Sequence, residues 1–580
     1  MNLSAEAGLD VGFFYDDDSH VEPSGKAEKG APGGGIFGRH VANGGFFDAW
    51  LNHGDWQRLT CVVSNQASGQ SLARRFSGHP KVKGTQRQLE VVPLPNFRNR
   101  FFPASPVRVL HLPQPVDAEF AWARQHNSPH AFALSGVTHT ISLKGVMERF
   151  RELVSGPFED YDSLFCISKA TLSVVRTVTD NYAAFLRERH GGAPRARLRL
   201  VQVPFGVDAE KFRPPSRQER SAARQQFGVA ADEVCVLFAG RLSYFSKAHP
   251  FPMFRAAVEA ARRVGCKVHF MLAGWADSPS ILQKFQQAAQ AFAPDHRTTI
   301  LDGMRPEDHL RTWRAADVFT SLSDNIQESL GLTILEAQAC GLPVVATDWD
   351  GCRDGVAAGE TGFLVPTRMV SGATTDGTSR HLLGETSYSE FLGETNQAVA
   401  VDAIAASNAL ERLFADEALR ARMGAAGRAR VLDQFTWPTV IRQYQDVWRD
   451  QEMVRREHAA RQERSTVRTP VPFPDVEYSF ASYPTELLGT DAQVVAADDA
   501  RSQLGMLLEL PIANYLPKPR IVDAVILTAI LEAAKKPCTL GSLEGVAGMD
   551  ANSRQRRRAT LAWLLKYDLL RVVPGEGGQA

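Results

Sequence analysis

The sequence is poor in cysteine and has no excess of charge of either sign. Its 580 residues include seven scattered cysteines and no CxxC pair. A disulfide framework or a cysteine zinc site is therefore not expected, and a reducing compartment is favoured. Sixty-five Lys and Arg balance sixty-five Asp and Glu. Because the net charge is zero, we do not expect the protein to bind nucleic acid or an anionic membrane through its overall charge; a local basic patch remains possible.

Long apolar runs are also missing. No apolar stretch approaches the roughly 20 residues that a bilayer span needs, and the N-terminus lacks the basic segment and apolar core of a signal peptide. A cytoplasmic location is predicted from these absences. With 44% hydrophobic and 22% charged residues the chain has the composition of a globular protein.

Short runs of β-branched and aromatic residues alternate with helical patterns in two successive series. Continuous apolar runs of this kind are typical of parallel strands buried on both faces. We therefore predict two doubly wound α/β domains that face a cleft, with ligands at the carboxyl ends of the strands. In the first series, strands are expected at 11–15, 59–63, 107–110, 131–134, 163–168 and 197–203. In the second, they are expected at 234–239, 268–273, 299–301, 318–322, 343–347 and 362–365.

The predicted domain boundaries follow these patterns. An N-terminal domain covers residues 1–205, a second α/β domain covers 206–436, and a helix at 437–450 returns to the first domain. Residues 451–515 are expected to form a linker or extension, because they show dense charge and then no clear period. Residues 367–397 are expected to be an irregular insertion in the second domain.

Residues 516–580 are predicted to form a small α+β domain that resembles a winged helix in its order of elements. The expected helix 553–567 begins with several arginines, yet residues 520–580 hold nine Lys and Arg against six Asp and Glu. That surplus is weak for nucleic-acid binding, which needs several phosphate contacts. Dimerisation or docking of a protein partner is the favoured role for this domain.

The candidate chemistry is concentrated in the second α/β domain. Glu328 and Glu336 are eight residues apart, about 80° out of phase on one continuous helix. If Glu328 instead lies in the loop before helix 332–340, both carboxylates can line one pocket. Glu328 could then bond sugar hydroxyls, and Glu336 could accept from two ribose hydroxyls. The free N–H groups of Leu330, Gly331 and Leu332 would suit a phosphate. The alternative is two solvated carboxylates on a surface helix.

Cationic side chains follow the first strand of this domain. Gly240 and Arg241 come directly after strand 234–239, and Lys247 lies six residues further on. A guanidinium and an ammonium there could meet the two phosphates of a leaving nucleoside diphosphate; a solvated loop is the alternative. After strand 299–301, Gly303 and Met304 could offer backbone groups to a base.

These segments resemble those of a known family, the retaining glycosyltransferases of the GT-B fold in family 4, also called glycosyl transferases group 1. Matching segments occur in order over about 235 residues: 203–214, 238–242 with Lys247, 328–346, 359–366 and 423–437. The resemblance to the N-terminal domain is looser and consists of the glycines at 33–35 and the segment 135–142.

The resemblance implies transfer of a hexose from a nucleotide sugar, with retention and without a metal or other cofactor. Glu336 would bind the donor ribose, Glu328 would contact the donor sugar, and Arg241 and Lys247 would neutralise the departing diphosphate. His139 would lie across the cleft near the donor sugar and the acceptor. Gly33, Gly34 and Gly35 would let the backbone approach a phosphate or the acceptor. The acceptor would be a glycan, a glycolipid or a small molecule.

Two alternatives remain at this stage. The expected helix 143–154 is amphipathic and carries three cations, so it could touch the inner face of a membrane that holds a lipid-linked acceptor. A surface helix on the sheet is the favoured interpretation. The rival function is a nucleotide-sugar-binding regulator that signals through the winged-helix-like domain. The enzyme is favoured by the presence together of Arg241, Lys247, Glu328 and Glu336, because binding alone would not require every group that stabilises the leaving diphosphate.

Overall fold

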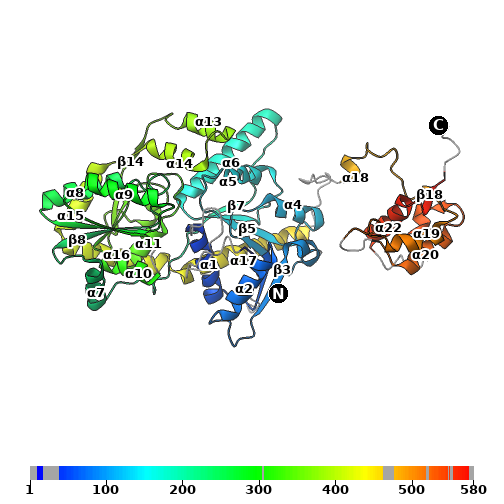
Figure 1. The fold of residues 1–580 in the computed structure, drawn as a ribbon, viewed down its shortest axis with the longest axis horizontal. Coiled ribbons are helices and arrows are strands. Elements are labelled where there is room, and N and C mark those ends of the chain that lie inside the picture. Colours follow the sequence, from blue (N-terminus) through cyan, green and yellow to red (C-terminus); the bar gives the residue numbers. More distant parts are fainter. Residues whose placement is uncertain are drawn as a thin grey trace. The chain divides into compact units, whose positions relative to one another are not determined.

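The computed structural model describes residues 9–16, 38–102, 104–302, 306–461, 476–516, 521–546, 548 and 553–573. The chain divides into two compact units, residues 1–472 and 473–580, which are described separately below. Figure 1 shows the elements of both units in order along the chain.

The first domain of the large unit is built on a seven-stranded parallel sheet. Its strand order is β3-β2-β1-β4-β5-β6-β7, which reverses direction between β1 and β4 as in doubly wound folds. The strands are β1 (Val11–Tyr15), β2 (Arg58–Val63), β3 (Gln88–Pro93), β4 (Val109–Leu112), β5 (Ala133–Val137), β6 (Ser163–Cys166) and β7 (Arg199–Gln202). The main helices are α1 (Gly38–His53), α2 (Gln66–Gly78), α4 (Ala118–Asn127), α5 (Lys144–Ser155) and α6 (Lys169–His190), with a short α3 (Phe97–Phe101). The sequence patterns missed α2 and β3.

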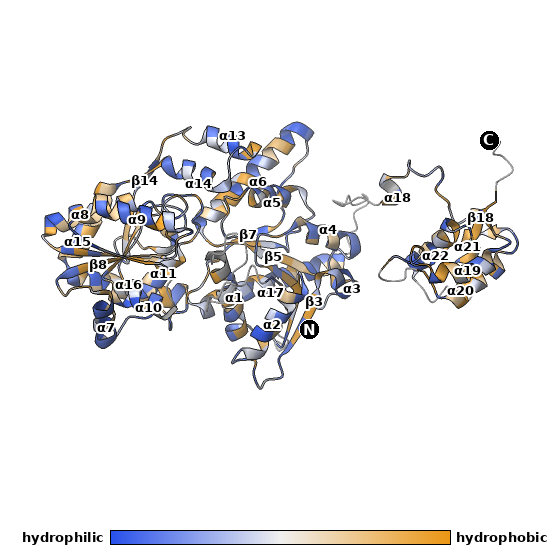
Figure 2. Ribbon diagram, viewed as in Figure 1, coloured by the Kyte–Doolittle hydropathy of each residue, from blue (hydrophilic) through white to orange (hydrophobic). Residues whose placement is uncertain are grey.

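The second domain repeats this topology with six parallel strands in the order β10-β9-β8-β11-β12-β13. They are β8 (Glu233–Ala239), β9 (Lys267–Gly274), β10 (Arg297–Asp302), β11 (Val318–Ser321), β12 (Val344–Thr347) and β13 (Gly362–Val365). All seven residues of β8 are buried, as its continuous apolar run predicts, and Figure 2 shows this sheet in hydrophobic colours. The covering helices are α7 (Arg217–Phe227), α8 (Pro250–Val264), α9 (Pro279–Phe292), α10 (Pro306–Ala315), α11 (Leu332–Ala339), α12 (Cys352–Gly355), α15 (Ala403–Ala415) and α16 (Glu417–Gln434). The two predicted doubly wound domains are confirmed.

Helix α17 (Trp437–Arg461) follows the second domain in the chain and packs on the first domain. Its buried Trp448 lies against Phe13 and Trp50 of the first domain, with ring centroids 5.9 and 5.2 Å apart. The Trp448 indole N–H also donates to Ser135 Oγ at 3.0 Å. The expected helix was to end at 450, but the buried side chains continue to Arg455, so α17 extends by about three more turns.

The segment after β13 is not irregular. Strand β14 (Thr367–Met369) pairs antiparallel with β15 (Val399–Val401), and a hairpin of two helices, α13 (Thr375–Leu383) and α14 (Tyr388–Gln397), lies between them. We call residues 367–401 the insertion. Both helices are short and mostly polar, which is why no apolar period marked them. The capping box of Ser387 and Glu390 at the start of α14 is the sequence signal that could have located that helix.

The small unit begins earlier than the predicted boundary at 516. Strand β16 (Gln493–Ala496) lies between β17 (Cys538–Thr539) and β18 (Leu570–Val572) in an antiparallel sheet, and α19 (Ala500–Glu509) packs on α20 (Ala524–Ala533). Residues expected to be a linker therefore supply the central strand of this sheet. Helices α21 (Leu540–Leu543) and α22 (Arg554–Lys566) follow as the sequence predicts, with a one-turn α18 (Val476–Ser479) at the start. The likeness to a winged helix stays a prediction.

The arginines that open α22 bond within the small unit. Arg556 donates to the backbone oxygen of Ile521 at 2.8 Å, and Arg558 donates to Glu544 at 3.2 Å. Arg557 lies 3.7 Å from the same carboxylate. Glu544 offsets part of the charge of Arg557 and Arg558, whereas Arg556 bonds a neutral carbonyl. That nucleic acid is not the partner stays a prediction.

Candidate functional site

The candidate site lies at the carboxyl end of the second sheet, where β8 and β9 come very close. Gly240 N–H donates to Ala273 O at 2.9 Å. A Cβ atom added to Gly274 would lie 1.7 Å from Gly240 O, so only glycine fits there. Gly240 itself has a φ of +142°, a conformation that side chains rarely adopt. These two glycines fix the direction in which the chain leaves β8 towards Arg241.

Arg241 is held by polar partners from two neighbouring loops. Its Nη2 donates to Gln327 Oε1 at 2.6 Å, and its Nη1 lies 3.8 Å from Asp277 Oδ2. Burial lowers the pKa of the guanidinium, an effect that the Asp277 and Glu328 carboxylates oppose. The side chain is only 12% exposed, so it is a partly desolvated cation at the sheet edge and not a solvated loop residue.

Lys247 and Glu328 form an ion pair next to Arg241. Lys247 Nζ lies 2.9 Å from Glu328 Oε2, and the two side chains are 27% and 18% exposed. The Lys247 backbone oxygen accepts from Ser323 Oγ at 3.0 Å and also from the Asn325 side chain, which ties the loop to the end of β11. The two residues are 81 positions apart in the sequence, and the fold brings their charges together.

Glu328 lies in the loop before α11, as one of the two sequence interpretations required. Its Oε1 accepts from Ser329 N at 3.3 Å and from Gly331 N at 3.2 Å. Burial raises the pKa of this carboxyl, but Lys247 and the two N–H groups outweigh burial, so that the pKa is lowered overall. The expectation that the Gly331 N–H faces an open phosphate pocket is not met here, because Glu328 occupies that donor. Leu330 is buried and Leu332 is half-buried beside it.

Glu336 lies inside α11, one helical turn before its end. Burial raises its pKa to about 7, and the charge of Lys211 only partly opposes this. The helix ends just before Gly341, whose φ is +77°. A carboxyl with a pKa near neutrality changes its hydrogen-bonding character at working pH.

The raised pKa of Glu336 gives a pH prediction for nucleotide binding. If the carboxylate accepts from two ribose hydroxyls, only the ionised form binds fully, so the affinity for a nucleoside diphosphate should rise with pH through about 7. Binding at pH 6 should be about tenfold weaker than at pH 8. Isothermal titration at several pH values measures this. Glu336→Gln is the control, since its remaining pH dependence reports the ligand and other groups; an equal slope in both proteins would contradict the assignment.

Sequence reasoning missed Asp350. It has a φ of +38°, unusual for a residue with a side chain, and it follows β12 in the turn that leads to α12. Its Oδ1 accepts from Cys352 N at 3.1 Å, whereas its buried Oδ2 has no hydrogen-bond partner in the described structure. Burial and then the charge of Glu328 raise its pKa well above the usual range. A Cβ at Gly351 would lie 2.5 Å from Ser329 O, so the backbone of this turn packs directly against the loop that carries Glu328.

Asp350→Asn should stabilise the free protein at pH 8. A carboxyl whose pKa is raised on folding costs stability above its unfolded pKa, and that cost grows as the pH rises towards the folded value. Asparagine keeps the acceptor for Cys352 N, tolerates a positive φ and removes the ionisable group. The thermal midpoint should rise by roughly 2 °C or more at pH 8, with less gain near pH 4. A variant that is less stable than the wild type at pH 8 would show that Asp350 is ionised and paired.

His139 follows β5 in the first domain. Its Nε2 lies 3.1 Å from Pro113 O, so Nε2 carries the proton, because a carbonyl only accepts. Its ring stacks on Phe205 at 5.1 Å with an interplanar angle of 21°. Three residues later, Ser142 Oγ lies 2.7 Å from the hydroxyl of Tyr388 on α14, so this segment of the first domain contacts the insertion of the second.

Several predicted site residues lie outside the described residues. These are Gly33, Gly34, Gly35, Gly303 and Met304. Within the described ranges, no group of three or more His, Cys, Asp or Glu side chains could hold a metal ion. Within the same ranges, no helix is both long and apolar enough to cross a membrane.

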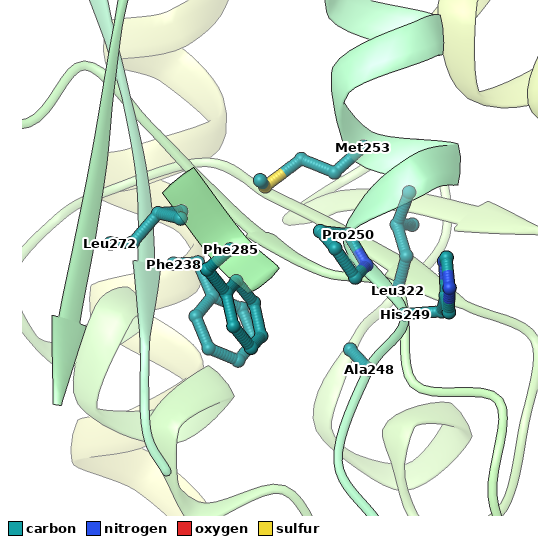
Figure 3. A pocket seen from close by; sticks show the side chains of 8 residues that line it. All are labelled: Phe238, Ala248, His249, Pro250, Met253, Leu272, Phe285 and Leu322. Atoms are coloured by element: carbon teal, nitrogen blue, oxygen red, sulfur yellow. The ribbon is translucent and has the colours of Figure 1, made fainter. Parts of the chain in front are cut away.

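A small apolar pocket supports the loop that carries Lys247. Figure 3 shows its lining, which includes Phe238 of β8, Met253 of α8 and Phe285 of α9. Ala248 and His249, which directly follow Lys247, also line it. None of the eight lining side chains is charged at neutral pH, since burial lowers the pKa of His249 and keeps its ring neutral. The pocket therefore anchors the loop and is unsuited to a phosphate.

Comparisons with known proteins agree with this geometry. Residues 233–381 match the family model of the glycosyl transferases group 1. The D-inositol 3-phosphate glycosyltransferase of Saccharomonospora viridis is 38% identical over 194 residues, which are 33% of this chain and 43% of that protein. The enzyme of the same name from Geodermatophilus obscurus is 35% identical over 195 residues, 33% of this chain and 41% of that protein. The chain thus spans about two fifths of the length of these relatives.

Among solved structures, Anabaena HepE in complex with UDP is 16% identical with a TM-score of 0.48, over 76% of this chain and 100% of that chain. The sucrose-phosphate synthase of Thermosynechococcus elongatus is 17% identical with a TM-score of 0.47, over 77% of this chain and 100% of that chain. The family match covers the strands, loops and helices that carry Arg241, Lys247, Glu328 and Glu336. The resemblance noted in the sequence is confirmed over residues 233–381, which match the family model of the glycosyl transferases group 1.

Proposed function

We propose that this protein is a glycosyltransferase that moves a hexose from a nucleoside diphosphate sugar to an acceptor held by its first domain. The observation that carries the proposal is the meeting of Arg241 and Lys247 with Glu328 at the carboxyl edge of the second sheet, inside the segment that matches the family. Ligands of open parallel sheets bind at this edge. A nucleoside diphosphate there could take the place of Glu328 beside Lys247 and add negative charge next to Arg241.

In the proposed reaction, the bond between the anomeric carbon and the diphosphate breaks while the acceptor hydroxyl oxygen bonds to that carbon. The proton of the hydroxyl and the nucleoside diphosphate leave. Negative charge grows on the diphosphate, so fixed cations beside it lower the barrier. Lys247 would exchange Glu328 for a phosphate oxygen, which frees Glu328 to bond a hydroxyl of the donor sugar. Glu336 would hold the ribose.

Retention and independence of a metal are part of the proposal and rest on the family resemblance. Two partly buried cations provide the charge compensation that Mg²⁺ supplies in other phosphate-transfer sites. His139 would face the reacting sugar from the first domain, with its Nε2–H engaged by Pro113. The named relatives act on inositol 3-phosphate, but they match only a third of this chain. The acceptor class therefore stays a glycan, a glycolipid or a small molecule.

Product analysis tests the proposal. The purified protein is incubated with a panel of UDP-, GDP- and ADP-sugars, and release of the nucleoside diphosphate is followed, since transferases of this type also hydrolyse a donor slowly without an acceptor. Proton NMR of the released or transferred sugar reports whether the anomeric configuration is kept. We expect turnover of at least one donor. Binding of nucleotide sugars with no turnover of any of them would instead support the regulator alternative.

A further inference from the structure

The start of α6 in the first domain is bonded to a carboxylate of the second domain. Lys169, the first residue of α6, donates its backbone N–H to Asp354 Oδ2 at 2.6 Å, and its Nζ lies 3.7 Å from Asp354 Oδ1. The Asp354 side chain, on α12, is 8% exposed, whereas that of Lys169 is 78% exposed. A carboxylate at this place satisfies a free N–H and faces the positive end of the helix dipole. The backbone N–H is therefore the main partner, and the exposed ammonium adds little.

On the first-domain side, the start of α6 is bonded to the segment that carries His139. Ser168 caps the helix through a reciprocal pair of hydrogen bonds with the third helical residue. The preceding Ile167 donates its N–H to Thr138 Oγ1 at 3.1 Å, and Thr138 directly precedes His139. The Lys169 N–H and His139 therefore lie on two adjoining segments that are bonded to each other.

On the second-domain side, α12 contacts both elements that carry the carboxylates of the site. Gly351, just before α12, packs on the backbone of the residue after Glu328, where an added Cβ would lie 2.5 Å from the carbonyl oxygen. Gly355 O, at the end of α12, accepts from Gln338 Nε2 at 2.9 Å, and Gln338 lies two residues after Glu336 on α11. A shift of α12 would therefore act on the positions of both carboxylates.

We propose that Asp354 is a positioning residue for the transfer reaction: by accepting the Lys169 N–H, it fixes the first domain relative to the α12 turn that supports the donor site. This inference rests on the proposed function and assigns a role to a residue outside the predicted site. Asp354 is engaged by α6 and acts on the reacting groups only through α12. Its loss should lower kcat more than it raises the KM, because the groups that face the reacting sugar come from both domains and a small displacement slows the reaction strongly.

Two substitutions break this contact from opposite sides. Asp354→Ala removes the acceptor. Lys169→Pro removes the donor N–H and should keep the helix, because proline is favoured at the first helical position and Ser168, with φ −149° and ψ 163°, already has the conformation that precedes a proline. We expect each change to lower kcat about tenfold for the donor that the panel identifies, with a KM within about threefold of the wild type. The double variant should be no slower than the single ones, because both changes break the same contact.

Three further variants separate the hydrogen bond from other effects. Asp354→Asn keeps an acceptor oxygen, so its kcat should stay within about threefold of the wild type. Lys169→Ala removes the exposed ammonium and keeps the N–H, so it should lower kcat by about twofold or less. Arg217→Pro is the matched control for proline: Arg217 is exposed and is the first residue of α7, whose serine cap forms the same reciprocal pair of hydrogen bonds. It should keep the wild-type kcat.

Hydrogen exchange followed by mass spectrometry gives a readout that does not depend on turnover. In Lys169→Pro, the amides of residues 327–335 should exchange about tenfold faster than in the wild type, although the substitution lies in the other domain. The amides of residues 268–274 in β9 should keep their rate and serve as the internal reference. Faster exchange at 327–335 together with a lower kcat supports the inference.

Unchanged exchange at 327–335 overturns the inference, and so does a wild-type kcat in both single variants. Single effects on kcat that multiply in the double variant overturn it as well, since they would be independent. If the wild type turns over no donor, the proposed function fails, and the exchange measurement still decides whether the contact of Asp354 with Lys169 acts on the loop that carries Glu328.

Discussion

Lys247→Ala should lower the rate of sugar transfer about 10²–10³-fold, the usual cost of removing one fixed donor that stabilises a developing negative charge. The ammonium lies 2.9 Å from Glu328 in the free protein, in a site that is largely shielded from water. Its loss removes the charge that should meet the departing diphosphate, and it leaves the Glu328 carboxylate without its counter-ion. The measurement is kcat for the donor that the panel identifies.

Lys267→Ala is the control for this prediction. Lys267 is 74% exposed and lies 3.7 Å from Asp232 on the surface, so its removal should leave the rate unchanged. The loss of the Lys247 positive charge has a second expected consequence: the pKa of Glu328, which Lys247 helps to hold down, should rise in Lys247→Ala. A rate within a factor of three of the wild type would contradict a role for Lys247 at the diphosphate.

Asp162→Ala should destabilise the large unit by about 3–5 kcal/mol, because it leaves a buried cation without a partner. Asp162 is fully buried at the start of β6. Its carboxylate accepts from Arg124 Nη1 and Nη2 at 2.6 and 2.7 Å, and from the backbone N–H groups of Leu134 and Glu159 at 2.8 Å. One side chain thereby joins α4, β5 and β6. Urea unfolding followed by tryptophan fluorescence measures the loss.

Asp446→Ala is the matched control, since Asp446 is 65% exposed and pairs with Arg449 at 2.9 Å within α17. An exposed pair of this kind contributes about 1 kcal/mol or less. Equal losses in the free energy of unfolding would contradict the stabilising role of the buried pair of Asp162 and Arg124. Comparing the two variants shows whether the loss of stability comes from removing any carboxylate or from removing the one that pairs with the buried Arg124.

The sequence predicts the two sheets well because their strands are buried on both faces. A run such as residues 234–239 has one physical solution, a parallel strand between helices, and the structure places it there. The site residues follow from the same logic, since Arg241 comes shortly after β8 and Glu328 lies in the loop between β11 and α11. The ion pair between Lys247 and Glu328 was not predicted, because it joins two loops 81 residues apart.

What could not be predicted depends on contacts between distant segments. The polar helices of the insertion are stabilised by a capping box and by packing on both domains, and neither leaves an apolar period. Strand β16 is four residues long and becomes a strand only through pairing with β17 and β18. Asp350 carries no motif: its significance comes from a positive φ and a buried, unpartnered oxygen.

A crystal structure of the full chain with its nucleoside diphosphate sugar tests the central claim most directly. We predict that the diphosphate oxygens lie within hydrogen-bond distance of Arg241 and Lys247, that Glu336 accepts from the ribose hydroxyls, and that Lys247 has exchanged Glu328 for a phosphate. A nucleotide bound elsewhere, with the Lys247–Glu328 pair intact at 2.9 Å, would contradict the account.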